Sequence, residues 1–193
     1  MEKSNYWNLM AVYPHAARAI EVAMAADQSI LFIGHPQDTY YLHQYCIEEK
    51  IKVYNFSPCE CGYYNSPIFP CSCEVDFVIK REREISTCGA DVVIEVPHPN
   101  PNDILRIIKG EYYHDSESKM KERVTKSQGV RVEDTILPEC ESLLSAAIRK
   151  IHLNLWTMLK VMERAKAIAR LEGAVKIKVH HLAEALQYLP RIK

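Results

Sequence analysis

Three short runs of apolar residues limit the fold of this chain more than any other feature. They cover residues 29–33, 51–56 and 92–96; the first run ends at Gly34 and the third at Pro97. The first run is continuous, which is typical of a strand buried on both faces, as in a parallel sheet with helices on either side. The segment 51–56, interrupted by Lys52 and Asn55, suits a second short strand, and 92–96 a third. The residues between the runs suit helices, which we expect over 14–27, 37–50 and 74–85.

After the third run the chain reads as helical throughout. Apolar residues recur three and four positions apart, which is the spacing of amphipathic helices. Asn102 is a suitable N-cap for the first of these helices, and Gly173 is a natural end for the long one. The expected helices cover 102–109, 143–151, 155–169 and 179–188.

The two halves of the chain differ in charge and in structural class. Residues 1–100 contain 7 Lys and Arg against 13 Asp and Glu, a balance of -6, while residues 101–193 contain 17 against 12, a balance of +5, which together give the net charge of -1. The change falls at a proline-rich segment, 97–101, which reads as a hinge. The sequence therefore predicts an α/β domain at 1–100 followed by an all-α domain at 101–193.

The composition excludes several classes of protein. With 48% hydrophobic and 25% charged residues, the chain is neither disordered nor fibrous. No apolar run approaches the roughly 20 residues that cross a bilayer. The first eight residues are polar and lack the apolar stretch of a secretory signal. We expect a cytoplasmic protein with no membrane contact.

Basic residues of the helical half form two clusters, at 119–126 and 160–170. Such clusters can attract an anionic partner, and nucleic acid is the candidate. More often, basic residues at helical spacing only solvate the outer face of a helix. The residues concerned are Lys119, Lys121, Arg123, Lys126, Lys160, Arg164, Lys166 and Arg170.

The segment 57–74 carries two Cys-x-Cys pairs, Cys59 with Cys61 and Cys71 with Cys73. Four thiolates brought together by one loop satisfy a tetrahedral Zn²⁺ and leave no open position for water, so the predicted site is structural. An iron–sulfur cluster also uses four thiolates, and four free cysteines are the remaining alternative. The other three cysteines are scattered and read as buried or idle thiols: Cys46, Cys88 and Cys140.

Two adjacent histidines, His180 and His181, stand where the last helix is expected to begin. Such a pair can support acid–base or metal chemistry. A surface or capping role is the commoner explanation for adjacent histidines at a helix start, and it is the one we expect here.

Several stretches together resemble one family of ATPases. Ser57 to Tyr64, with its Cys59-Glu60-Cys61-Gly62-Tyr63 core, is similar to the cysteine signature of magnesium-chelatase-like AAA+ ATPases of the ComM type. The stretch 15–23 and the strand ending at Gly34 resemble the segments that lead into the family's phosphate loop. The endings 167–173 and 181–188 resemble its helical lid.

The resemblance implies a reduced AAA+ core. AAA+ sheets have the parallel strand order 5-1-4-3-2, and the stretch carrying the acidic Mg²⁺-binding strand is missing from this chain. Removing strands 2 and 3 leaves the order 5-1-4, which would correspond to 91–96, 29–33 and 51–56. The expected fold is therefore about three parallel strands with flanking helices, followed by a helical lid. The strand 51–56 would become an edge that needs cover.

The residues at the family's phosphate loop depart from its pattern. A phosphate loop needs a Lys for the phosphates and a Ser or Thr for Mg²⁺. Tyr40 stands at the lysine position, Tyr41 at the hydroxyl position, and Asp38 adds negative charge. The degenerate loop consists of Gly34, His35, Pro36, Gln37, Asp38, Thr39, Tyr40 and Tyr41.

Other catalytic positions of the family are also changed. The segment that supplies a finger arginine aligns with Cys88 and Gly89, the lid's sensor arginine falls on Trp156, and Ser57 replaces an Asn. Each of the lost cationic groups would stabilise the transferring phosphoryl, and one arginine finger alone is worth about 10³–10⁵ in rate. We therefore expect no ATP binding and no catalysis.

These observations predict a non-catalytic, zinc-stabilised pseudo-ATPase that acts by binding a protein partner. The alternative is a DNA-binding accessory protein that uses the basic clusters of the helical half. An enzyme with residual nucleotide turnover is the third and least favoured class.

Overall fold

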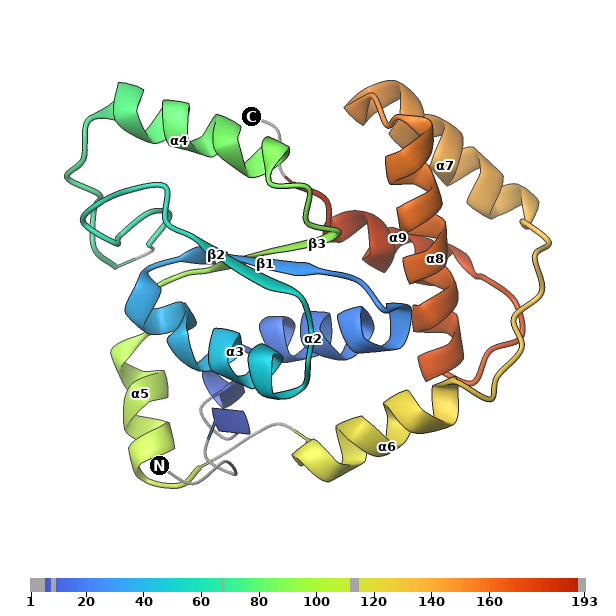
Figure 1. The fold of residues 1–193 in the computed structure, drawn as a ribbon, viewed down its shortest axis with the longest axis horizontal. Helices are drawn as coiled ribbons and strands as arrows, with labels where there is room; N and C mark the ends of the chain where they lie inside the picture. The colour runs from blue at the N-terminus through green and yellow to red at the C-terminus, as the bar shows by residue number, and fades with distance from the viewer. Residues whose placement is uncertain (1–5, 8–9, 67, 112–114, 191–193) are drawn as a thin grey trace.

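The computed structural model describes residues 6–7, 10–66, 68–111 and 115–190. It is a mixed α/β fold in which a small parallel sheet lies between helices, with a group of further helices on one side (Figure 1). The three strands are β1 (Ile30–Gly34), β2 (Val53–Phe56) and β3 (Val92–Val96). The three strands expected from the apolar runs are confirmed.

The sheet order is β2-β1-β3, and both pairings are parallel. Ile30 lies opposite Val53 on one side and Val92 on the other, so β1 is the central strand. All five residues of β1 are buried, because neighbouring strands cover its edges and helices cover its faces. This accounts for its unbroken apolar sequence.

Alternate residues of the strands enter two separate cores. Ile30 and Phe32 point into the main core, with α2 (Pro14–Ala26) and α3 (Pro36–Glu48). Leu31 and Ile33 point to the other face, where α4 (Val75–Thr87) covers them. Figure 1 shows α2 and α3 below the sheet and α4 above it.

The remaining helices extend the main core away from the sheet, except the helix Pro101–Ile108, which has no buried residue. The longest of them, α8, packs against α2 and α9, and its Ile168 belongs to the same apolar core as Ile20 of α2. These elements are the 3-10 helix η1 (Met10–Val12), α5 (Pro101–Ile108), α6 (Glu117–Ser127), α7 (Pro138–Ile151), α8 (Leu155–Leu171) and α9 (Val179–Gln187).

The start of α5 differs from the expectation. Asn100, not Asn102, is the N-cap, and its side chain accepts a hydrogen bond of 2.9 Å from the Asn102 backbone N–H. Pro101 then occupies the first helical position, where its missing N–H costs nothing.

Within the described residues, no helix is both long and apolar enough to cross a bilayer.

Arg164 of α8 joins the helical group to the sheet. Its side chain is fully buried, and it donates hydrogen bonds to Gln28 Oε1 at 2.9 Å, to the Ala185 carbonyl at 2.8 Å and to the Asp91 carbonyl. Gln28 immediately precedes Ser29 and the central strand, and it donates in turn to the Lys160 carbonyl at 2.9 Å. One guanidinium therefore links α8, α9 and the segments that lead into β1 and β3.

Asp91 and Ser29 fix the entry of these two strands. The Asp91 carboxylate accepts from the Ser29 backbone N–H at 3.0 Å and from its hydroxyl at 2.8 Å, and the Asp91 N–H donates to that hydroxyl at 3.1 Å. Burial lowers the pKa of Arg164 to about 10, although the Asp91 charge opposes this shift. The guanidinium therefore stays charged at neutral pH.

Replacing Arg164 with Met is expected to lower the free energy of unfolding by about 3–5 kcal/mol, because three buried acceptors lose their donor. Arg164→Lys should fall between Met and the wild type, since an ammonium cannot reach three acceptors in the planar geometry of the guanidinium. Urea denaturation followed by circular dichroism measures both changes. The exposed Arg149→Met is the control and should stay within about 0.5 kcal/mol of the wild type. Equal stabilities for the Arg164 and Arg149 variants would contradict this role.

Candidate metal centre

The four predicted cysteines converge in one cluster. All four Sγ atoms lie within 4.8 Å of one another. Cys61 Sγ is 3.6 Å from Cys59 Sγ and 3.5 Å from Cys71 Sγ, and the Cys61 backbone N–H donates to Cys73 Sγ at 3.4 Å. The chain folds back on itself between the two Cys-x-Cys pairs, so the spacing seen in the sequence does bring the thiols together.

These distances suit four ligands of a single metal ion. A tetrahedral site with metal–sulfur bonds of about 2.3 Å has sulfur–sulfur edges of about 3.8 Å. The observed contacts are close to that edge length, and all seven described cysteines are free thiols. In an iron–sulfur cluster the thiolates bind different iron atoms and must spread apart, which fits these distances less well. The cluster can therefore hold one metal ion without a large change of the backbone.

The loop holds the cysteines through its own backbone. The Ser57 hydroxyl donates to the Cys59 carbonyl at 2.7 Å, and Gly62 turns the chain with φ of 79°. Burial raises the pKa of Cys61, but hydrogen bonds from the backbone N–H groups of Tyr63 and Ser72 and from the Cys71 and Cys59 thiols outweigh it and bring the pKa to about 6. Burial raises the pKa of Cys59 to about 12, so Cys61 is the thiol that ionises more readily. A metal ligand must be a thiolate, so these N–H groups favour the binding form of Cys61.

The cysteine loop packs directly on the start of α3. Gly62 lies so close to His35 that a Cβ atom at position 62 would overlap the imidazole ring. Beside this contact, Tyr63, Phe69 and His98 form a cluster of rings whose centroids are 5.1 to 5.7 Å apart. The loop therefore covers the carboxyl edge of the sheet, beside residues 34–41.

The backbone N–H groups at the start of α3 all have partners within the protein. Pro36 has no N–H, and the Gln37 N–H donates to His35 Nδ1 at 3.3 Å. The N–H groups of Asp38 and Thr39 both donate to the His35 carbonyl at 3.0 Å. A helix start binds an anion through free N–H groups. None of the N–H groups in this first turn is free.

Side chains of residues 34–41, which the resemblance aligned with a phosphate loop, are also engaged. Asp38 is paired with His98 Nδ1 at 2.9 Å, and its charge favours the helix N-terminus where it lies. Gly34 ends β1, and a Cβ atom there would overlap the Val96 carbonyl, so the glycine is needed for the close approach of β3. Tyr40 and Tyr41 pack edge to face with ring centroids 5.6 Å apart.

The basic residues of the helical half are mostly paired with carboxylates. Lys121 contacts Glu49 at 2.7 Å, and Arg123 contacts the buried Glu21 at 2.6 Å. Similar partners serve Lys126, Lys160 and Lys166. Arg164 is a correction to the expected cluster: it is fully buried, because it bonds three acceptors in the core, and it cannot reach a partner.

A second group of potential ligands, Glu172 with His180 and His181, includes a residue that the sequence did not single out. Glu172 Oε2 lies 3.0 Å from His180 Nε2 and 2.9 Å from His181 Nε2. The Lys178 backbone N–H donates to His181 Nδ1 at 3.0 Å, so the neutral ring carries its proton on Nε2 and has no lone pair there for a metal. Burial lowers the pKa of His181, which favours this neutral form. The expected capping role holds for His181, whereas His180 lies at the surface.

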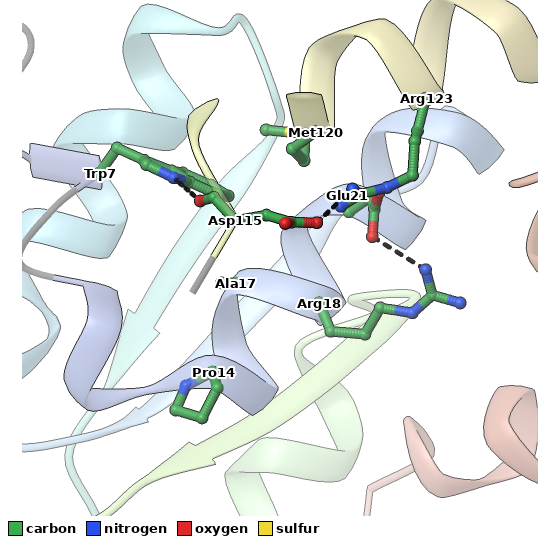
Figure 2. Close-up of a pocket in the computed structure, with 8 residues that line it drawn as sticks. All are labelled: Trp7, Pro14, Ala17, Arg18, Glu21, Asp115, Met120 and Arg123. Atoms are coloured by element: carbon green, nitrogen blue, oxygen red, sulfur yellow. Dashed lines mark hydrogen bonds and ion pairs between the residues drawn. The ribbon is translucent and has the colours of Figure 1, made fainter. Parts of the chain in front are cut away.

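A pocket of about 280 Å³ lies between α2 and α6 and was not predicted (Figure 2). Its floor is the buried Glu21, which Arg18 contacts at 2.8 Å and Arg123 at 2.6 Å. Trp7 forms one wall and donates its indole N–H to the Asp115 carbonyl at 2.8 Å. The two guanidinium groups are thus neutralised within the protein. Arg123 and Glu21 are 102 positions apart and Trp7 and Asp115 are 108 apart, so no local spacing reveals these two contacts.

A scan against models of protein families and a search of curated proteins each gave no match for this chain.

Replacing Gly62 with Ala is expected to lower the free energy of unfolding by about 2–4 kcal/mol, from the left-handed backbone and the overlap with His35. Gly173→Ala is the matched control, because Gly173 has φ of 69° but open space around its Cβ position. Gly173→Ala should lower the free energy of unfolding only by the cost of placing an alanine in the left-handed backbone conformation. Adding His35→Ala should recover part of the loss at Gly62 and none at Gly173, as measured by thermal unfolding. Purely additive effects of Gly62→Ala and His35→Ala would contradict the contact.

Proposed function

We propose that this protein is a non-catalytic, zinc-stabilised interaction module. The observation that carries the proposal is the closed start of α3, where every N–H group of the first turn has a partner within the chain. The cysteine loop lies against the same residues. Ligands often bind at the carboxyl edge of a parallel sheet. In this protein the cysteine loop covers that edge.

The closed edge argues against a nucleotide. A triphosphate needs free backbone N–H groups, a cation and a Mg²⁺ ligand. The charged side chain in the first turn of α3 is the carboxylate of Asp38, which would repel a phosphate group. Tyr40 and Tyr41 offer no cation. This arrangement supports a protein that acts by binding partners through its surface and does not transfer phosphoryl groups.

Zinc is the metal that best suits the cluster. Four thiolates at tetrahedral spacing favour Zn²⁺ among the divalent ions, and they leave no position for a reactive water. In this role Cys59, Cys61, Cys71 and Cys73 would hold the ion, and the ion would supply structure only. The loop carries few buried apolar side chains, with most of residues 60–77 exposed or half-buried, so ligation would contribute much of its order.

An origin from magnesium-chelatase-like AAA+ ATPases is part of the proposal. The central position of β1 between β3 and β2 is the arrangement that a 5-1-4 remnant would have. The helices α7, α8 and α9 would then correspond to the lid. Under this proposal, the ancestral ATPase lost two strands, the cysteine loop came to cover the carboxyl edge of the sheet, and both changes accompanied the loss of ATP hydrolysis.

Exposed apolar side chains support a protein partner. Leu155 and Trp156 at the start of α8 are 69% and 68% exposed, and Val75 of α4 is 70% exposed. Apolar groups gathered at a surface mark sites of contact with other proteins. Nucleic acid, the alternative partner, gains no comparable support, because most of the basic residues expected to bind it are paired with carboxylates.

Purified protein is expected to contain about one zinc ion per chain, measured by elemental analysis. A strong chelator should lower the melting temperature, because the binding energy of a structural zinc ion is folding energy. Cys73→Ser should reduce the bound zinc, whereas Cys140→Ser, at a thiol outside the cluster, should leave it unchanged. A metal-free protein of the same stability would refute the zinc site.

Mg-ATP is expected to leave the melting temperature unchanged. A ligand present at 100 times its dissociation constant would add about 2.7 kcal/mol to the stability, which is easily detected. Differential scanning fluorimetry with millimolar Mg-ATP, Mg-ADP and a nonhydrolysable analogue makes the comparison. A clear rise that depends on the nucleotide concentration would overturn the non-catalytic proposal while leaving the zinc site intact.

A further inference from the structure

The turn between α7 and α8 exposes a group of apolar side chains, which we call the apolar corner. Ile148 and Ile151 lie in the last turns of α7, and Leu155, Trp156 and Leu159 lie in the first turns of α8. Their exposed fractions range from 37% for Ile148 to 69% for Leu155. Five large apolar residues within twelve positions are more than the single exposed residues normal for a surface.

Two cations border the apolar corner and have no carboxylate partner among the described residues. They are Arg149 and Lys150, both exposed in the last turn of α7. Arg149 donates only to the Ser145 carbonyl, at 3.2 Å, within its own helix. This contrasts with Lys121, Arg123 and Lys166 of the same half, which all contact carboxylates.

The start of α4 carries the opposite charge beside a similar apolar group. Val75, Phe77 and Ile79 are 70%, 36% and 41% exposed. Glu74 and Asp76 alternate with them and are exposed, and neither has a cationic partner among the described residues. We call these five residues the acidic tip.

We propose that the apolar corner of one copy binds the acidic tip of a second copy of this chain. The inference rests on the proposed function, in which the protein acts through surface contacts. Each surface offers exposed apolar groups together with charges that the other can neutralise. The helix ends agree as well: Arg149 and Lys150 lie at the C-terminal end of α7 and Asp76 at the N-terminal end of α4, so the two helix dipoles would meet favourably.

The two surfaces cannot meet within one chain. In Figure 1 the start of α4 lies at the upper left, next to the cysteine loop, whereas the α7–α8 turn lies at the upper right. Contact between different patches is a head-to-tail arrangement, in which a pair of copies leaves one apolar corner and one acidic tip free. Association should therefore continue beyond a dimer as the concentration rises. A small interface of this kind gives weak, micromolar association.

Sedimentation equilibrium of the 193-residue chain over a wide concentration range tests the proposal. The average mass should rise steadily past that of a dimer, and added salt should lower it because the contacts are partly ionic. Arg149→Glu with Lys150→Glu should raise the dissociation constant at least about tenfold, and Glu74→Lys with Asp76→Lys should do the same. A chain that carries all four changes should associate again, because the charges are then complementary in the reverse sense.

Matched controls separate this contact from general charge effects. Lys119→Glu on α6 and Glu48→Lys on α3 change exposed residues outside both surfaces and should leave the association unchanged. Zinc content and melting temperature of each variant show whether the fold is intact, which matters most for Glu74 beside Cys73. A monomer at every concentration, or association that ignores the charge reversals, would overturn the self-association. Either result would leave the zinc and nucleotide measurements, and hence the proposed function, standing on their own.

Discussion

The buried guanidinium of Arg164 is the interaction on which the arrangement of this fold depends. It donates to Gln28, Asp91 and Ala185, so one side chain determines how α8 and α9 sit against the entry of β1 and β3. A three-stranded sheet has little surface of its own to hold several helices. The apolar core supplies the energy of packing, but it is nondirectional, and the guanidinium adds the geometry that selects one docking position.

The two ends of the sheet are closed by different means. At the end where β1 and β3 begin, internal hydrogen bonds close the sheet: Arg164 donates to the Asp91 carbonyl, and the Ser29 hydroxyl donates to the Asp91 carboxylate. At the carboxyl edge the cysteine loop covers His35, and rings from Tyr63 and His98 pack beside it. A sheet this small would otherwise leave polar backbone and apolar side chains exposed at both ends. The loop therefore has a role in folding whatever it binds.

Local sequence patterns were sufficient for the strands, most of the helices and the cysteine cluster. The apolar run of β1 and the two Cys-x-Cys pairs each carry their signal within a few residues. Long-range contacts were beyond such patterns. Arg164 looked like one more surface cation of a helix, and its acceptor Gln28 lies 136 positions away. The link of Glu172 to His181 spans only nine positions, but it crosses the turn between α8 and α9, and a glutamate near a helix end gives no sign that a buried imidazole faces it.

The contact between Gly62 and His35 makes the closed edge hard to open by a single substitution. A lysine introduced at position 40 would add one positive charge, but the neighbouring amides would still be hydrogen-bonded to His35. The loop that rests on that imidazole would also have to swing aside and take its thiols with it. Creating an anion pocket at this edge would thus require several coordinated replacements, whereas the outer surface can change one residue at a time.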